Sequence, residues 1–376
     1  MKNIPQIIFV VVFAFLLIGI GHFVVYKSII SVFNITNLKI IHNLRIFFLI
    51  GSLSFITMTL ITQIGYSPIG AFLYKISAIW LGTIYFLFFA SVLFFITFWV
   101  LQYFGDYSII SKNIGLGLFI LAIGVSAFGV VNSFNINVTK YNVLINNLPE
   151  EWENKDIVMF ADSHFGNIRN IKFGKKLVSK INEQNPEIVL IAGDYYDGPS
   201  VNSKKIAELM SRVKTKKGIF FASGNHEEYG DTVSFIKSLA DSGVNILNNK
   251  VIDIDGLQIV GIDYKNGLSS DLILATLNSI DLKIDRPKIL IKHVPDSLSQ
   301  VESKDFDIVV SGHTHNGQVW PGPYLATKIF KEFSYGLNFI NKMAVVTTSG
   351  VGTWGPPQRV GTRSEIVAIR LNNKSE

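Results

Sequence analysis

Five of the chain's seven histidines follow short apolar runs in its C-terminal part, and each has an aspartate or asparagine nearby. They are His164, His226, His293, His313 and His315. Asp162 lies two residues before His164, the same spacing that separates His313 from His315. Because residues i and i+2 of an extended chain point to the same side, we expect each pair to face one spot. Imidazole nitrogen and carboxylate oxygen together favour divalent first-row metal ions.

A further carboxylate of this region, Asp194, has two oxygens with which it could bridge two metal ions. Two ions about 3.5–4 Å apart can clamp a phosphoryl group and activate a water molecule for in-line attack. Taken singly, each motif also has a plain structural explanation, such as turn or helix-cap chemistry, or a histidine that hydrogen-bonds the backbone. These alternatives apply to Asp162-x-His164, Gly193-Asp194, Gly224-Asn225-His226-Glu227, the lone His293 and the His313/His315 pair. The ordered combination of all five motifs favours the metal site.

The elements that must position these residues are short apolar strands alternating with helix-like stretches. We predict strands at 137–147, 157–160, 188–192, 219–222, 259–262, 289–291, 308–310, 345–348 and 366–369. Predicted helices occupy 171–183, 203–213, 232–241 and 270–279. This alternation predicts a layered α/β domain in which helices cover the sheets. Ligand sites in such sheets gather at the carboxyl ends of strands, where the five histidines are found.

The first third of the chain has a different composition, being rich in Phe, Ile, Leu and Val and almost without acidic residues. Four apolar segments, at about 7–26, 45–64, 77–103 and 114–133, are long enough to cross a bilayer. We therefore predict a four-helix transmembrane anchor over residues 1–134 and a globular domain over residues 135–376. No carboxylate lies inside a predicted span, which argues against a transporter.

An even number of spans puts the N-terminus and the globular domain on the same side of the membrane. Basic residues near the spans are Lys27, Lys39, Arg45 and Lys112 in the first and third loops, against Lys2, Lys75 and Lys140 on the other side. The positive-inside rule then predicts a globular domain outside the cytoplasm, by a margin of one residue.

Other features exclude several classes of function. The chain has no cysteine, so it has neither disulfides nor thiolate metal ligands. Its formal net charge of +6 is modest for 376 residues, and the densest basic cluster, Lys214-Thr-Lys-Lys217, fits a solvated loop. No basic stripe interleaved with aromatic residues is present, so we expect no nucleic-acid partner.

The five motifs together resemble the calcineurin-like metallophosphoesterases. That family's pattern is Asp-x-His, Gly-Asp-x-x-Asp, Gly-Asn-His-Asp/Glu, a lone His and Gly-His-x-His, all found here in order. The resemblance covers about residues 140–371 and is strongest to bacterial membrane-attached members, whose pattern continues with a Gly-x-Gly…Pro-x-Arg stretch that ends here at Arg359. Asn316 replaces a glycine that is frequent in those relatives, and asparagine tolerates left-handed backbone angles. The family's fold implies two packed mixed β-sheets flanked by helices.

The resemblance also implies roles for individual residues. One metal ion would be held by Asp162, His164, Asp194 and His315, and a second by Asp194, Asn225, His293 and His313. His226 would contact the phosphate and protonate the leaving oxygen, while Asp197 would orient its imidazole. Arg359 or Arg363 would bind substrate phosphate, although a surface salt bridge explains either arginine equally well.

These features predict a membrane-anchored dinuclear phosphoesterase of the bacterial plasma membrane. In it, hydroxide activated by the metals attacks a phosphomonoester or phosphodiester and His226 acts as the general acid. Two divalent ions are expected, Mn²⁺ in preference to Fe or Zn²⁺, all three of which the nitrogen and oxygen donors accept. Attachment to the membrane favours lipid-linked or cell-envelope substrates, with membrane lipids as partners. The alternative is a non-catalytic, metal-bound membrane sensor or interaction protein.

Overall fold

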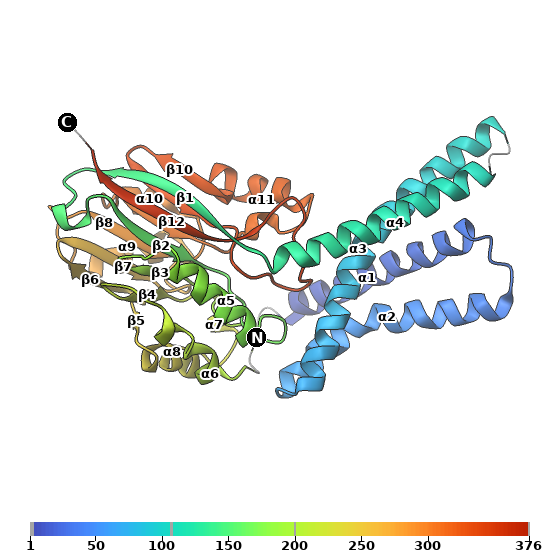
Figure 1. The fold of residues 1–376 in the computed structure, drawn as a ribbon, viewed down its shortest axis with the longest axis horizontal. Coiled ribbons are helices and arrows are strands. Elements are labelled where there is room, and N and C mark those ends of the chain that lie inside the picture. The colour runs from blue at the N-terminus through green and yellow to red at the C-terminus, as the bar shows by residue number, and fades with distance from the viewer. Residues whose placement is uncertain (1–3, 106–107, 199–200, 375–376) are drawn as a thin grey trace. The chain divides into compact units, whose positions relative to one another are not determined.

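The computed structural model describes residues 4–105, 108–198 and 201–374, with the backbone alone for residues 4–11 (Figure 1). The chain divides into two compact units. Unit 1 comprises Met1–Val131 together with Gly355–Gln358, and unit 2 comprises Asn132–Trp354 together with Arg359–Glu376. The predicted division at residue 134 stays a prediction, although the two units separate close to it.

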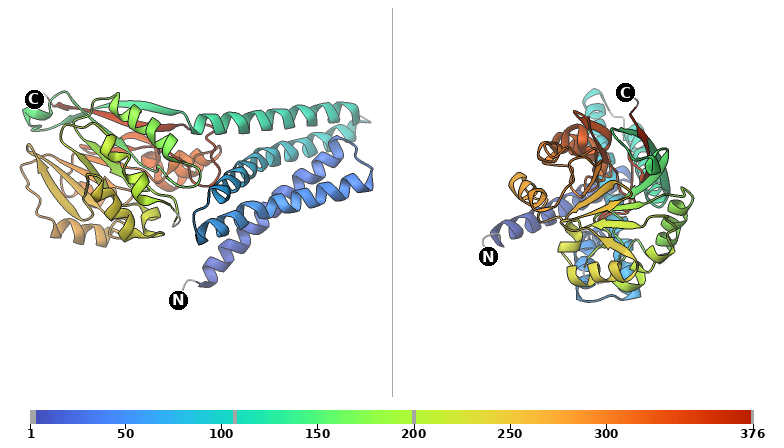
Figure 2. Two further views of the ribbon diagram at one scale, coloured as in Figure 1. Left: turned by 60° about the horizontal axis from the view of Figure 1, so that its bottom comes forward. Right: turned by 90° about the vertical axis from the view of Figure 1, so that its left-hand side faces the viewer.

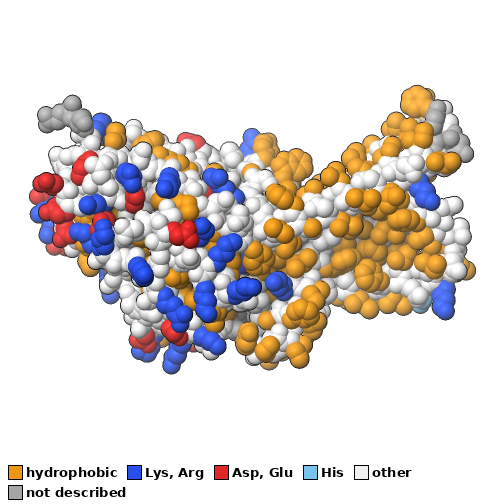
Figure 3. Space-filling view, in the orientation of Figure 1, with side chains coloured by type: hydrophobic (Ala, Val, Ile, Leu, Met, Phe, Trp, Pro, Cys, Tyr) orange, Lys and Arg blue, Asp and Glu red, His pale blue; other side chains and the backbone are white. Residues whose placement is uncertain are grey.

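Unit 1 is built from four apolar helices, as the sequence predicts. They are α1 (Ile4–Val32), α2 (Leu38–Ile64), α3 (Pro68–Phe104) and α4 (Ser108–Ser133), and each contains a segment long and apolar enough to cross a membrane. Local capping sets where α2 and α3 begin, since the side chains of Asn37 and Ser67 accept hydrogen bonds from backbone N–H groups of the first turn. Figure 3 shows apolar side chains over the outer surface of these helices, which is the surface that lipid requires.

The segment Gly355–Gln358 also belongs to unit 1, although it lies far along the chain from the four helices. The side-chain amide of Gln358 donates a 2.7 Å hydrogen bond to the Ser126 hydroxyl of α4. The same amide lies against Gly82 of α3, where a Cβ atom would overlap it. Gly82 therefore leaves the space that this polar side chain occupies.

Unit 2 contains two mixed six-stranded sheets, which confirms the predicted fold class (Figure 2). The first has the order β1-β12-β2-β3-β4-β5 and the second β10-β11-β9-β8-β7-β6. The strands of the first sheet are β1 (Ile136–Ile145), β2 (Lys155–Phe160), β3 (Val189–Ala192), β4 (Ile219–Ala222), β5 (Val244–Ile246) and β12 (Ser364–Asn373). Those of the second are β6 (Lys250–Ile254), β7 (Leu257–Ile262), β8 (Lys288–Lys292), β9 (Ile308–Ser311), β10 (Gly336–Ile340) and β11 (Met343–Thr347).

The helices of unit 2 are α5 (Ile171–Asn182), α6 (Ser203–Ala207), α7 (Asn225–Glu228), α8 (Thr232–Asp241), α9 (Ser270–Ser279), α10 (Leu298–Glu302) and α11 (Gly322–Phe330). Residues of α5, α6 and α8 pack with strands of the first sheet, and residues of α9 and α10 pack with strands of the second. Short 3-10 turns occupy Glu150–Trp152, Met210–Arg212, His315–Gly317 and Lys331–Ser334. The predicted helix at 203–213 is therefore replaced by α6 and a separate 3-10 turn.

Alternation along the strands explains the layers. On β2, Ile157 and Met159 belong to the core between the two sheets, whereas Val158 and Phe160 pack with the helices outside. Because neighbouring side chains of a strand point to opposite faces, one apolar run supplies two cores. Burying each such side chain stabilises the fold by about 1.5–3 kcal/mol.

The strand register aligns the ends of the central strands. Phe160 of β2 pairs with Ile191 of β3, which pairs with Phe221 of β4. In the second sheet Ile291 of β8 pairs with Val310 of β9. Each of these residues ends or nearly ends its strand, so the loops that follow leave the sheets at the same level.

Candidate metal centre

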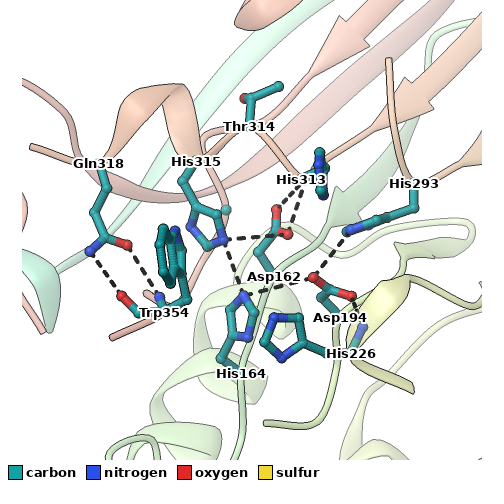
Figure 4. Close-up of polar contacts among 12 residues, drawn as sticks. Asp162, His164, Asp194, His226, His293, His313, Thr314, His315, Gln318 and Trp354 are labelled. Atoms are coloured by element: carbon teal, nitrogen blue, oxygen red, sulfur yellow. Dashed lines mark hydrogen bonds and ion pairs between the residues drawn. The ribbon is translucent and has the colours of Figure 1, made fainter. Parts of the chain in front are cut away.

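Five loops that follow β2, β3, β4, β8 and β9 bring the predicted ligands together (Figure 4). In Figure 4 the imidazoles of His164, His293 and His315 point toward the carboxylates of Asp162 and Asp194. All five of these side chains are buried. Buried charged and titratable side chains require partners, and here those partners are one another.

Asp162, His164 and His315 form a first group whose ligand atoms lie within 4.8 Å of one another, as a shared metal ion would need. His164 Nε2 is 3.1 Å from His315 Nε2. His315 Nε2 is in turn 3.6 Å from Asp162 Oδ1. Two imidazole nitrogens and a carboxylate oxygen thus converge on one point.

Asp194, His293 and His313 form a second such group. His293 Nε2 lies 3.2 Å from Asp194 Oδ2. The side-chain oxygen of Asn225 is 3.1 Å from His293 Nε2 and also 3.1 Å from His313 Nδ1. The first group contains three of the four residues of the first predicted ligand set, without Asp194. The second group contains three of the four residues of the second set, with Asn225 beside it.

The Asp194 carboxylate faces both groups. Its Oδ2 lies 3.2 Å from His293 Nε2 in one group and 3.9 Å from His164 Nε2 in the other. Its second oxygen, Oδ1, accepts a 2.8 Å hydrogen bond from the backbone N–H of His226. One oxygen of this buried carboxylate therefore lies near an imidazole of each group.

The tautomer of His293 shows that the second group suits a cation. Its Nδ1 lies 2.7 Å from the backbone carbonyl oxygen of Ala192, which can only accept, so Nδ1 carries a proton. Its Nε2 then faces the oxygens of Asp194 and Asn225. A nitrogen between two acceptor oxygens needs a cation there, either a proton or a metal ion. The donor set of the site therefore fits divalent metal ions.

The charges of the buried groups are strongly coupled. Burial raises the pKa of Asp162 to about 6, and the nearby Asp194 adds to this effect. Burial opposes ionisation of Asp194, but the imidazoles of His293 and His164 hold its pKa well below the usual range. Burial lowers the pKa of His293, yet Asp194 outweighs burial and the net pKa is about 9. Burial and the charge of His293 lower the pKa of His313 to about 4.

The expectation that an i, i+2 pair points to one spot is wrong for His313 and His315, whereas Asp162 and His164 do share a group, although their backbone is not extended. β9 ends at Ser311 and β2 at Phe160, so both pairs lie in the loops beyond the strands. Asp162, His164, His313 and His315 all have positive φ, between 46° and 67°. As a result His313 and His315 turn to different groups. Such backbone costs roughly 1–3 kcal/mol per residue and is concentrated at functional sites.

Asn316, which replaces a frequent glycine, also adopts the left-handed conformation, with φ 47° and ψ 39°. Asparagine is among the residues that tolerate this region, as expected from its short polar side chain. The substitution is therefore compatible with the loop that carries His315.

His226 and Asp197 lie beside the two groups. His226 Nδ1 is 3.3 Å from Asp197 Oδ1, and its ring meets that of His164 edge-on with centroids 4.4 Å apart. Burial lowers the pKa of His226, but Asp197 raises it and the net shift is upward. His226 also forms a third close group with His164 and Asp194. Its position is therefore compatible with both a general acid and a metal ligand.

The two predicted phosphate-binding arginines have other partners. Arg359 is fully buried and its guanidinium donates to the backbone carbonyl oxygens of Ser349, Gly352 and His315. Arg363 is half-exposed and pairs with the buried Glu365. Arg359 therefore orders the loop that packs on Asp162. Phosphate binding by Arg359 or Arg363 stays a prediction.

One residue with a clear role at this site was missing from the predicted set. The buried carboxylate of Glu227 accepts hydrogen bonds from the backbone N–H groups of Asp194, Tyr195, Tyr196 and Gly224. It thereby ties the loop after β3 to the loop after β4. Its place as the fourth residue of the Gly-Asn-His-Glu motif was the signal available in the sequence.

Comparison with known proteins places this site in a family. Residues 155–317, which contain every predicted metal ligand, match the family model described as calcineurin-like phosphoesterase. An uncharacterized metallophosphoesterase of Campylobacter jejuni is 33% identical over 264 residues, covering 69% of this chain and 70% of that protein. A transmembrane protein with metallophosphoesterase domain from Danio rerio is 30% identical, covering 68% of this chain and 62% of that protein. An uncharacterized metallophosphoesterase of Aquifex aeolicus is 27% identical over 262 residues, covering 68% of this chain and 98% of that protein.

Gly224→Ala tests the close approach of the loops after β3 and β4. A Cβ atom at Gly224 would overlap the Asp194 carboxylate, so we expect the substitution to displace it and to lower bound metal and activity together. Metal analysis of the purified full chain measures the loss. Gly117→Ala is the control, because the new Cβ of that helical glycine would meet no atom within 4 Å outside the adjacent residues and the nearby backbone of its own helix. Unchanged metal content in Gly224→Ala would contradict the geometry.

Glu227→Gln tests the four backbone hydrogen bonds at the base of the site. The amide replaces two charge-assisted acceptor positions by one acceptor and one donor that faces N–H groups. We therefore expect a loss of about 2–4 kcal/mol in the free energy of unfolding, seen as a lower melting temperature. Glu208→Gln is the control, since that exposed carboxylate pairs with Arg212 on the surface. Equal melting temperatures for the two variants would refute the role of Glu227.

Proposed function

Because the chain belongs to the calcineurin-like phosphoesterase family, we propose that it is a membrane-anchored hydrolase that cleaves phosphomonoester or phosphodiester bonds at a dinuclear metal centre. The four apolar helices make it a membrane protein. The observation that carries the proposal is the position of Asp194 Oδ2, which faces His164 in one group of potential ligands and His293 in the other. A single buried carboxylate in this position suits two neighbouring ions.

The ligand sets follow from the two groups. Asp162, His164, Asp194 and His315 hold one ion, and Asp194, Asn225, His293 and His313 hold the other. The N–H of His313 donates to both oxygens of Asp162, at 3.1 and 3.0 Å, and orients that carboxylate. Mn²⁺ is the proposed metal because all seven donors are nitrogen or oxygen, a set that also admits Fe or Zn²⁺.

Two bound divalent ions supply charge neutralisation for the phosphoryl group and a hydroxide nucleophile at neutral pH. The chain's own residues supply the proton for the leaving group. His226 is less buried than the neighbouring His164, and its Nδ1 is turned to Asp197. Its Nε2 is thereby left to contact the phosphate ester and to protonate the departing oxygen. Asp197 keeps the imidazole protonated and oriented.

The substrate class follows from the anchor. A site held at a bilayer meets lipid-borne esters at a high effective concentration, which favours lipid-linked or cell-envelope phosphate esters as substrates. The excess of basic residues in the first and third loops supports a plasma-membrane protein whose domain faces away from the cytoplasm.

Asp194→Asn tests the bridging role. We expect turnover of p-nitrophenyl phosphate and bis-p-nitrophenyl phosphate to fall by about 10³-fold or more, because the loss of one bridging charge weakens the binding of both ions. Metal analysis of the same sample should show fewer than two ions per chain. Asp241→Asn, an exposed carboxylate of α8, should leave both quantities unchanged. An active Asp194→Asn variant with full metal content would disprove the assignment.

His226→Ala tests the general acid. The variant should keep its metals and lose about 10²–10⁴-fold in kcat on an alkyl phosphate ester, whose leaving oxygen needs a proton. The loss should be much smaller on the p-nitrophenyl ester, whose leaving group departs as a stable anion. Asp197→Asn should show the same pattern more weakly. Equal losses on both esters, or a loss of metal, would assign His226 another role.

A further inference from the structure

Helix α11 has an apolar surface that faces outward. In α11, which the structure describes in full, Ala326 is the one buried residue, whereas Leu325 and Ile329 are 56% and 71% exposed. Tyr324 is exposed beside them, and Trp320, two residues before the helix, is 63% exposed. We call these four side chains, Trp320, Tyr324, Leu325 and Ile329, the α11 face. Soluble surfaces seldom gather large apolar side chains in this way without a partner.

The polar residues around the α11 face are those of a membrane-surface helix. Lys328 lies one turn after Tyr324, with its ammonium 5.2 Å from the tyrosine ring, and Lys331 follows the end of the helix. Glu332 is the acidic residue next to them. Tryptophan and tyrosine are favoured at headgroup level, and lysine is attracted to anionic lipids.

Hydrogen bonds tie the start of the α11 face to the point where the chain leaves helix α4. The side-chain amide of Asn132, in the last turn of α4, donates to the backbone oxygens of Arg359 and Thr362, at 2.9 Å each. Between these two, the Val360 oxygen accepts a 3.0 Å hydrogen bond from the N–H of Trp320. Asn132 and Ser133 end α4, whose apolar segment is long enough to cross a membrane, so these bonds keep Trp320 near the residues at which the chain leaves that segment.

The other end of α11 is beside the candidate metal centre. The ring of Phe330, its last residue, meets His313 edge-on with centroids 6.0 Å apart. The helix thus connects Trp320, which lies near the end of α4, to a predicted metal ligand.

We propose that the α11 face docks on the lipid bilayer that holds the anchor, with its aromatic and aliphatic side chains at the depth of the headgroups. The bilayer is the occupant because this same chain carries four membrane-crossing helices, and a second copy would need to bring its own complementary surface. Docking would present the phosphate of a membrane lipid to the metal centre. That second step rests on the proposed function, whereas docking itself does not.

The absence of cysteine makes a direct test of docking available. Full-length Leu325→Cys and Ile329→Cys are labelled with a nitroxide and reconstituted into vesicles of phosphatidylcholine and phosphatidylglycerol. We expect the nitroxide to collide more often with dissolved oxygen, which enters the bilayer, than with a nickel complex that stays in water. This ratio is the signature of a label within the bilayer. Ile284→Cys is the control, because Ile284 is 89% exposed and precedes β8, at the end of that strand away from the site. Its label should collide freely with nickel.

Two results would overturn docking. One is nickel accessibility at Leu325 and Ile329 equal to that at Ile284. The other is spin–spin broadening between labels at these positions, which would show that a second copy covers the face.

The presentation step has a separate test. Leu325→Lys and Ile329→Lys should lower hydrolysis of a phosphate ester carried by a vesicle lipid by about tenfold, while hydrolysis of a water-soluble ester stays unchanged. Equal rates on the lipid ester for variant and parent would overturn presentation. If the parent hydrolyses neither ester, the proposed function fails, and the nitroxide measurement still decides docking.

Discussion

The arrangement of the site depends on how the Asp194 carboxylate is held. The backbone of Asp194 has a positive φ. Its Oδ1 accepts a hydrogen bond from the N–H of His226, and its Oδ2 faces imidazoles of two separate groups. Buried Glu227 fixes the backbone N–H of Asp194 itself. Without these constraints, two clusters of imidazoles would have no common anion between them. With them, a buried carboxylate lies between the two groups, as two neighbouring dications would need.

The sheets supply the precision that this carboxylate needs. Aligned strand ends deliver five loops to one edge, and the core between the sheets keeps that edge rigid. Strain in the loops is tolerated because strands on both sides are fully buried and cannot shift to relieve it. Arg359 extends the same rigidity to the loop of Gly350 and Gly352, whose backbone packs on Asp162 and leaves no room for side chains there.

Sequence patterns predicted the central strands, the four apolar helices and the residues that meet at the site, because long apolar runs and ligand-type side chains are local signals. They missed β5, β6 and β10, which are edge strands in which a polar residue interrupts every apolar run. They also missed α11, a nine-residue helix whose first residues, Gly322 and Pro323, are typical of turns. The backbone at His313 and His315 could not be predicted, because positive φ in these residues is imposed by tertiary packing.

The central claim is that two metal ions share the Asp194 carboxylate in one chain. Electron paramagnetic resonance of the full-length protein loaded with Mn²⁺ measures this directly, because two ions bridged by a carboxylate are magnetically coupled. The structure predicts the multiline spectrum of a coupled pair, which Asp194→Asn should convert to the spectrum of isolated ions. A six-line spectrum of uncoupled Mn²⁺ in the unmodified protein would contradict the claim.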